Sequence, residues 1–226
     1  MPATLPDLSS FFQRYEALSA ATDAIFEQVR TAFPAEVSCH LGCTSCCHAL
    51  FDLSLAEALY LKQKFDLRYP SGLERAAIID RADSADRKAT KMKRDFYKEA
   101  SAGTETSDIL QQAAQASLRC PLLGDNDECI LYEFRPLTCR VYGIPTAIGG
   151  KGHTCGKTKF AKGTLYPTVN MDKIQQSLGA LSHELAGFIG TRYDELHLVY
   201  LPVSFILITD LTPEYLGIGK GTAGGN

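Results

Sequence analysis

Tryptophan is absent from the 226-residue sequence, and no apolar run is long enough to cross a membrane. The longest run, 198–208, is interrupted by Pro202 and is far shorter than the roughly 20 apolar residues of a spanning helix. The first basic residue is Arg14, and two prolines precede it, so the start of the chain does not resemble a signal peptide. We therefore expect a cytoplasmic protein with no membrane partner.

A strong charge of either sign is also missing, because 23 Lys and Arg residues nearly balance 26 Asp and Glu residues. The formal net charge of −3 excludes a general attraction to nucleic acid, and we expect no nucleic-acid partner. The sequence contains neither a P-loop nor a dinucleotide-binding fingerprint. Its 45% hydrophobic and 22% charged residues are ordinary for a globular protein, and its length predicts a single domain over 1–226.

What the chain does have is eight cysteines in two compact groups. They are Cys39, Cys43, Cys46 and Cys47, and then Cys120, Cys129, Cys139 and Cys155, with none in 48–119. This density is below that of small disulfide-stapled secreted proteins. Clustered cysteines in a reducing compartment are more often metal ligands, so we expect segments 39–47 and 120–155 to bind metal. The alternatives are buried thiols that behave as small hydrophobes and a disulfide framework.

Thiolate ligands favour zinc, copper(I) or iron–sulfur clusters, and four of them complete a zinc site or hold a four-iron cluster. Eight therefore serve one centre with spares, or two centres. In a helical turn the adjacent Cys46 and Cys47 side chains would point about 100° apart, so either they face two centres or one of them is not a ligand. We expect two centres, with the two sequence groups interleaved in space. The dipeptide Cys120-Pro121 resembles the end of bacterial ferredoxin motifs, which slightly favours an iron–sulfur cluster over zinc.

Helical periodicity covers most of the remaining chain and predicts a mainly α protein, a single helical domain with a long metal-stapled irregular loop. Ser54 with Glu57, and Ser71 with Glu74, have the spacing of capping boxes. The segment 196–211 is apolar and fits a helix or a strand, and the glycine-rich tail 217–226 is expected to be flexible. The predicted helices span 7–33, 54–68, 71–102, 107–118 and 171–190, and the loop spans 120–169.

The spacing from Cys39 to Cys46 also resembles the cluster motif of radical S-adenosylmethionine enzymes. Two features count against that family. Ser45 stands where that family usually has an aromatic residue, and the chain lacks the alternation of strands and helices that the family needs. We therefore give this resemblance little weight.

A closer resemblance is to the YkgJ family of cysteine-cluster proteins, which is described as a zinc- or iron-chelating domain. The segment from Cys39 to Cys47 is similar to that family's cysteine-rich run ending in a Cys-Cys pair. The second match begins at Cys120-Pro121-Leu122-Leu123 and is most specific in the run Tyr-Glu-Phe-Arg-Pro-Leu-Thr-Cys-Arg at 132–140. The three-residue gap between Cys39 and Cys43 departs from the family, where two is common. The resemblance implies metal chelation and assigns no reaction.

Arg135 and Arg140 lie on either side of Cys139, and we expect both to contact the cofactor. A thiolate centre carries negative charge, which a guanidinium offsets; the alternative is an ion pair with Glu133 or Glu128. His40, His48 and His153 lie near cysteines and are expected to be bystanders.

Three functions are consistent with these residues. The first is a metalloprotein with a redox-active or catalytic cluster that modifies a protein or peptide partner, a role that flagellin lysine methylases, which carry a similar cluster, suggest by analogy. The others are a zinc-stabilised binding module, and a metal-handling protein that sequesters or delivers zinc or iron. The sequence does not decide whether the chain is an enzyme.

Overall fold

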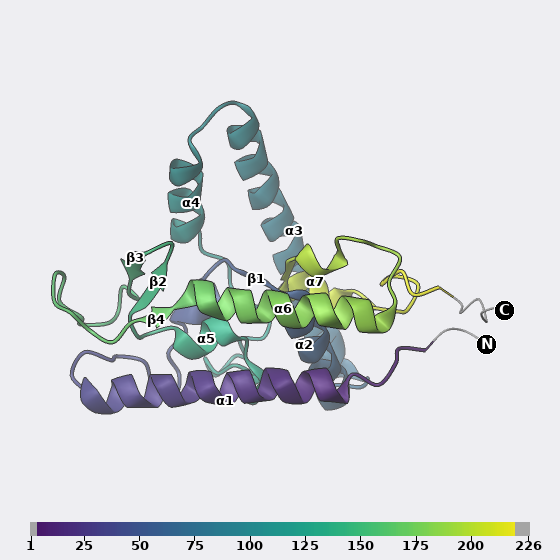
Figure 1. The fold of residues 1–226 in the computed structure, drawn as a ribbon, viewed down its shortest axis with the longest axis horizontal. Coiled ribbons are helices and arrows are strands. Elements are labelled where there is room, and N and C mark those ends of the chain that lie inside the picture. Colours follow the sequence, from purple (N-terminus) through teal and green to yellow (C-terminus); the bar gives the residue numbers. More distant parts are fainter. Residues whose placement is uncertain (1–3, 220–226) are drawn as a thin grey trace.

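Helices form most of the chain in the computed structural model, which describes residues 4–219 (Figure 1). The expectation of a mainly α fold is confirmed. None of the described helices is long and apolar enough to cross a membrane. The helices are α1 (Ser9–Ala32), α2 (Leu55–Arg68), α3 (Leu73–Ser101), α4 (Thr106–Gln115), α5 (Leu137–Val141), α6 (Met171–Ile189) and α7 (Val203–Ile208).

The helices α1, α2, α5 and α6 enclose the larger of two apolar cores. Helix α5 lies between α1 and α6 in Figure 1, and its Leu137 is fully buried. Tyr15 from α1, Leu59 from α2 and Leu185 from α6 pack in the same cluster. The short helix that carries Cys139 is therefore fixed by the core of the body, which we define as α1, α2 and α6.

The two predicted capping boxes have different outcomes. Ser54 and Glu57 form the box at the start of α2, because each side chain bonds the other residue's backbone N–H. The prediction of a capping box at Ser71 and Glu74 is wrong. Helix α3 starts after Gly72, whose φ of +99° suits a residue without a side chain, so Glu74 falls one position too early to complete a box.

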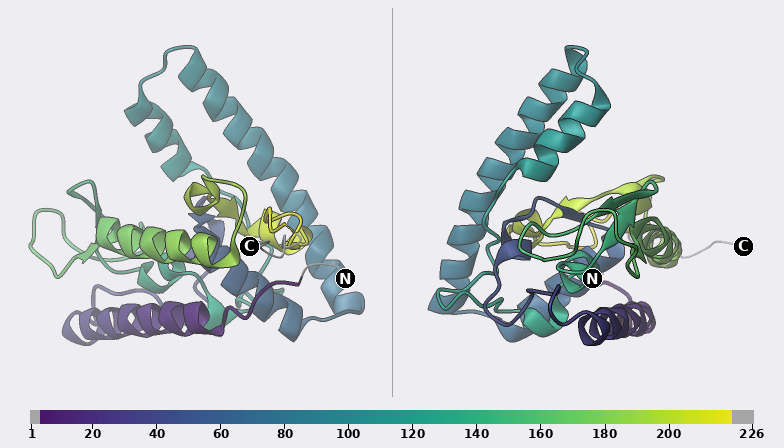
Figure 2. Two further views of the ribbon diagram at one scale, coloured as in Figure 1. Left: turned by 45° about the vertical axis from the view of Figure 1, so that its right-hand side comes forward. Right: turned by 90° about the vertical axis from the view of Figure 1, so that its left-hand side faces the viewer.

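Helices α3 and α4 form a hairpin that projects from the body (Figure 2). One face of α3 is buried at Ile78, Ala82, Ala85 and Ala89, and this half of the helix packs against α7. The small alanines on that face let α3 and α7 approach closely. Further along, Phe96 is only half-buried, because there the helix has left the body and pairs with α4.

The segment expected to be one long irregular loop contains regular pieces. Besides α5, it holds a 3-10 turn at Tyr132–Phe134 and a small sheet. In that sheet β2 (Thr146–Ile148) pairs antiparallel with β3 (Lys151–His153) and parallel with β4 (Val169–Asn170). The strand β3 is therefore an edge.

The C-terminal segment is mixed rather than purely helix or strand. It contains a 3-10 turn at Leu196–Leu198, the strand β5 (Leu201–Pro202) and α7. Strand β5 pairs antiparallel with β1 (Asp52–Leu53), just after the first cysteine group. At the start of the expected tail, the Gly217 oxygen accepts a hydrogen bond from the Arg192 N–H at 3.0 Å; the rest of that tail, from 220, lies outside the described residues.

Candidate metal centre

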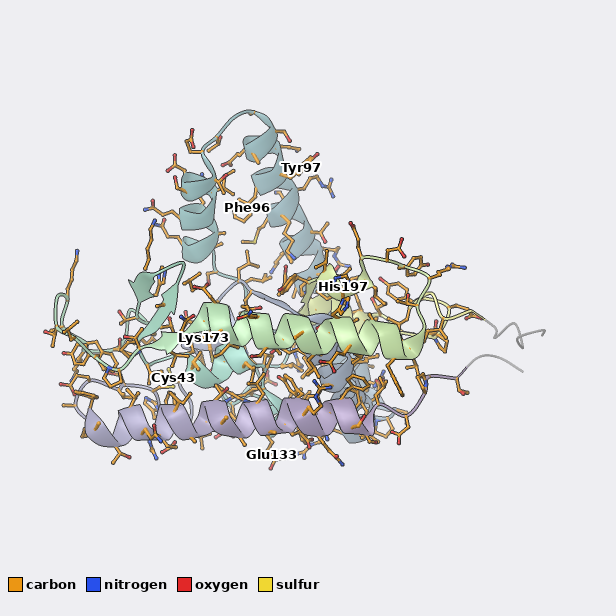
Figure 3. The ribbon with its side chains drawn as sticks, in the orientation of Figure 1. Cys43, Phe96, Tyr97, Glu133, Lys173 and His197 are labelled. Atoms are coloured by element: carbon orange, nitrogen blue, oxygen red, sulfur yellow. The ribbon has the colours of Figure 1, made fainter. Side chains whose placement is uncertain are left out.

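Six of the eight cysteines line one cavity of about 50 Å³, which we call the cysteine cavity. They come from both sequence groups: Cys43, Cys46, Cys47, Cys120, Cys129 and Cys139. Backbone hydrogen bonds join the two segments, since the Cys120 N–H donates to the Cys47 oxygen at 2.7 Å and the Leu118 N–H donates to the His48 oxygen at 3.0 Å. All eight cysteines are free thiols. In the view of Figure 3, Cys43 appears near Lys173, at the start of α6.

Cys46 and Cys47 face the same cavity, and our expectation that their side chains diverge is wrong. They lie in a tight 3-10 turn, Ser45–His48, and their sulfur atoms are 3.9 Å apart. Because each side chain can rotate about its Cα–Cβ bond, neighbouring residues of a turn can direct their sulfurs into one cavity. Two sulfurs bound to one tetrahedral zinc, at about 2.3 Å from the metal, would be separated by about 3.8 Å. The pair is thus spaced as two ligands of one centre.

Cys39 and Cys155 lie to the side of this cavity. Gly143 packs directly on Cys39, and a Cβ placed on Gly143 would lie 2.7 Å from the Cβ of Cys39. Gly143 also has a φ of +108°, so both its space and its conformation require glycine. Cys155 instead lines a separate groove of about 350 Å³.

We call this second hollow the Phe51 groove. Its walls come from the segment 49–51, α4, α5, the β2–β3 hairpin and the start of α6. The residues that matter below are Phe51, Thr138, Ile148, His153, Thr154 and Cys155.

Burial and crowding set the ionisation of the thiols. Burial raises the pKa of Cys120 to about 12 and that of Cys39 to about 11, and it also raises the pKa of Cys129. Cys46 is the exception, because hydrogen bonds from Cys139 and Cys47 lower its pKa. Cys46 is thus the cysteine whose surroundings most favour the thiolate, and a metal that binds here must displace thiol protons.

The donor set fits a soft metal, although the thiols have not converged on one point. Within residues 4–219, no three His, Cys, Asp or Glu side chains are grouped as ligands of a single ion. Thiolates select zinc or iron–sulfur clusters over hard cations. The cavity of about 50 Å³ is also far below the roughly 300–1,000 Å³ of pockets for organic ligands. A compact inorganic centre fits, provided that the cysteine side chains turn inward.

Arg135 brings positive charge to the cysteine cavity. It lines the cavity, and its guanidinium lies 4.1 Å from the centroid of the Tyr132 ring. The same group donates to the backbone carbonyl oxygen of Tyr132 at 3.1 Å and to the Asp23 carboxylate on α1 at 3.2 Å. Three contacts thus hold the guanidinium at the edge of the thiols.

Arg140 has a different position from the one we expected. It is buried, and it is not among the described residues that line the cysteine cavity. It donates to the backbone carbonyl oxygens of Arg135 at 2.9 Å and Glu133 at 2.6 Å, and it forms an ion pair with the Asp23 carboxylate. The carboxylate partner is therefore Asp23 rather than Glu133 or Glu128, and the contact joins α1 to the chain around Cys139.

The comparison with family models decides the family. Residues 38–156, more than half of the chain, match the CxxCxxCC family, whose description is "Putative zinc- or iron-chelating domain". The chain belongs to the CxxCxxCC family. The match begins just before Cys39 and ends just after Cys155, so it covers all eight cysteines. A search of curated proteins and a search of solved structures found no match.

Within the CxxCxxCC segment, the start of α5 is anchored by a carboxyl group that sequence reasoning did not place at the site. Glu57 is buried, and its carboxyl accepts from the Leu137 N–H at 3.1 Å and from the Tyr15 hydroxyl at 3.3 Å. Burial raises the pKa of this carboxyl. The signal that would have revealed it is a single acid within the apolar run 55–61. Asp23 had no comparable signal.

The three histidines of the CxxCxxCC segment lie in different places. His40 is exposed and lines the mouth of the cysteine cavity. The Nδ1 of His48 lies 3.0 Å from the backbone carbonyl oxygen of Thr44, which ties the imidazole to its own turn. His153 is exposed on β3 and lines the Phe51 groove.

Proposed function

We propose that the thiolates of the two sequence groups hold an iron–sulfur cluster in the cysteine cavity, with zinc as the alternative metal. The observation that carries this proposal is the meeting of six cysteines from both groups around one small cavity. Four thiolates suffice for a cluster, so the six include a complete set. Cys39 and Cys155 supply two further thiols beside the cavity, at the places where the 39–47 segment and the Phe51 groove meet it.

Arg135 would balance the charge of this centre. A cluster or a zinc ion bound by four thiolates carries net negative charge, and a nearby guanidinium donor lowers the cost of that charge. Arg140 contributes indirectly, because it holds the chain around Cys139 against α1 through Asp23. When bound, the metal would supply electron transfer or Lewis acidity, while these side chains fix the position and charge of its ligands.

We further propose that the centre has a redox or protein-modifying role rather than a purely structural one. The Phe51 groove lies next to the cysteine cavity, and a hollow beside a metal centre gives a substrate access to it. The alternative is a zinc-stabilised binding module or a metal-handling protein. The backbone hydrogen bond from the Cys120 N–H to the Cys47 oxygen supports that alternative. It joins the same two segments, 39–47 and 120–155, that a structural zinc would hold together. Free thiols suit a reducing compartment such as the cytoplasm.

Metal analysis on protein purified without oxygen tests the proposal. We expect iron and acid-labile sulfide in stoichiometric amounts, a brown colour and broad thiolate-to-iron absorption that bleaches with dithionite. A colourless protein with stoichiometric zinc would replace iron by zinc and favour the structural role. Protein that binds neither metal, under conditions in which it is folded, would overturn the proposal.

A further inference from the structure

We propose that the Phe51 groove binds an extended, uncharged peptide segment and seats one of its apolar side chains beside the cysteine cavity. Binding in the groove needs no metal; only the use of that bound segment by the centre rests on the function proposed above. Three features of the groove support the inference: its lining, its position and the edge strand that borders it.

The lining selects an uncharged, apolar ligand. The groove has a volume of about 350 Å³, within the roughly 300–1,000 Å³ typical of ligand pockets. Of the described residues that line it, none is Asp, Glu, Lys or Arg. The contrast is with a larger hollow of about 650 Å³ next to the start of α1, which is lined by Lys62 and by Asp7, Asp66 and Asp210. The nearest cation in the sheet, Lys151, pairs with Ile148 but does not line the groove. A charged group seated among the lining residues would therefore lose water without gaining a charged partner there.

The position of the groove connects it to the metal centre. Phe51 lines both the groove and the cysteine cavity, so one aromatic side chain separates the two hollows. Thr138, which precedes the cavity residue Cys139, also lines the groove, and so does Cys155. A side chain seated in the groove would therefore lie one residue away from the proposed ligands.

The edge strand β3 favours a peptide over a compact small molecule. Thr146 and Ile148 of β2 lie on one face of the sheet, since alternate residues share a face. His153 of β3 pairs directly with Thr146 and so lies on that face too. All three line the groove, and each residue of β3 is exposed. An extended peptide that pairs with the free edge of β3 would place every second side chain on the face that forms the groove wall.

The test uses the full-length, metal-loaded protein and two capped five-residue peptides, TVLVT and TVDVT. Calorimetry gives the affinities, and hydrogen–deuterium exchange locates the bound peptide. We expect TVLVT to bind at least about tenfold more tightly than TVDVT, because the central aspartate would be desolvated without a partner. We also expect TVLVT to slow amide exchange in the segment 146–153.

Variants separate the groove from the rest of the surface. Ile148→Glu and His153→Glu each introduce charge at an exposed groove residue and should weaken TVLVT binding at least about tenfold. Leu165→Glu is the control, because Leu165 is 97% exposed and does not line the groove. The Leu165→Glu variant should bind TVLVT with the same affinity as the wild type.

Three results would overturn the inference: no binding of TVLVT, equal binding of both peptides, or affinities that neither groove variant changes. Metal content measured on the same samples keeps the two proposals apart. Folded protein that takes up neither iron nor zinc yet binds TVLVT in the groove would refute the metal centre and support the groove. Metal-loaded protein that binds no peptide would support the metal centre and refute the groove.

Discussion

The body and the cysteine region are held together by different forces. In the body, α1, α2 and α6 pack through side chains such as Tyr15, Leu59 and Leu185. In the cysteine region, 39–53 and 117–155, the described helices and strands have at most five residues. Buried side chains such as Leu131 and Leu137 anchor this region, and polar contacts to the body add to that packing. Mutations in the body should therefore act through packing, and mutations in the cysteine region also through ligands and charges.

Two carboxylates from the body reach across this boundary. Asp23 on α1 binds both Arg135 and Arg140, and Glu57 on α2 accepts from the N–H of Leu137. Both carboxylates act on the chain within four residues of Cys139. The body thus helps to position the cysteine region through these two carboxylates, while the thiols of that region are the groups that can bind a metal.

The largest effect should come from the cysteine cavity. Cys139→Ser removes one of the six thiols that line the cavity, and we expect metal affinity to fall by more than the roughly 10- to 100-fold that loss of an outer contact costs. Thermal stability should fall with it, because metal binding is coupled to folding. Metal content and melting temperature measure both effects. Cys155→Ser is the control, and its smaller loss would match its place outside the cavity; equal metal content in Cys139→Ser and the wild type would contradict the site.

A substitution in the body should lower the stability of the fold without changing the amount of bound metal. Leu185 is fully buried on α6, and Leu185→Ala should reduce the free energy of unfolding by about 2–5 kcal/mol through lost packing and a cavity. Metal stoichiometry should stay the same, since α6 contributes no cysteine. Urea unfolding with metal analysis checks this, with the exposed Gln176→Ala as control. Loss of metal in folded Leu185→Ala protein would mean that the two parts are not separable.

The boundary contact at Asp23 should have an intermediate effect on both parts. Asp23→Asn leaves the buried guanidinium of Arg140 without its counter-charge, which should cost about 1–3 kcal/mol of unfolding free energy. It should also speed metal release to a chelator, because Arg135 loses one of its contacts. Glu27→Gln, on the same helix, is the control, since Glu27 pairs with Arg30 at the exposed surface and such pairs contribute little. Equal release rates in the two variants would remove Asp23 from the site.

Sequence reasoning was most successful where regular repeats determine structure. The helix predicted at 171–190 and the capping box at Ser54 were both confirmed, because helical period and cap chemistry act over a few residues. It failed at Ser71, where the φ of Gly72 shifts the helix start, and at Cys46 and Cys47, where side-chain rotation outweighs the turn geometry. Asp23 was missed because its partners lie more than 100 residues away. Neither period nor motif encodes such a contact.

The smallest expected effect is a pH dependence that comes from Glu57. Burial raises the pKa of this carboxyl in the folded protein above its ordinary value of 4.5. Below about pH 4.5 the carboxyl is protonated in both states, and its favourable contribution to folding is complete. As pH rises from there towards the folded-state pKa, the unfolded chain releases the proton first, and the free energy of unfolding falls. The Tyr15 hydroxyl beside it has its own pKa raised, chiefly by burial, so it titrates far above this window.

Glu57→Gln isolates that contribution because glutamine cannot ionise in the same place. Relative to the wild type, the variant should gain stability progressively as pH rises above about 4.5, and the difference should become constant beyond the folded-state pKa. Glu184→Gln is a control of opposite sign, since a hydrogen bond from Arg14 lowers the pKa of Glu184 and its contribution is lost as pH falls. Urea unfolding of the three proteins between about pH 3 and pH 8 measures the slopes. Parallel curves for Glu57→Gln and the wild type would show that the Glu57 carboxyl is as easily ionised in the folded chain as in the unfolded one, and that α5 is held by an ordinary carboxylate.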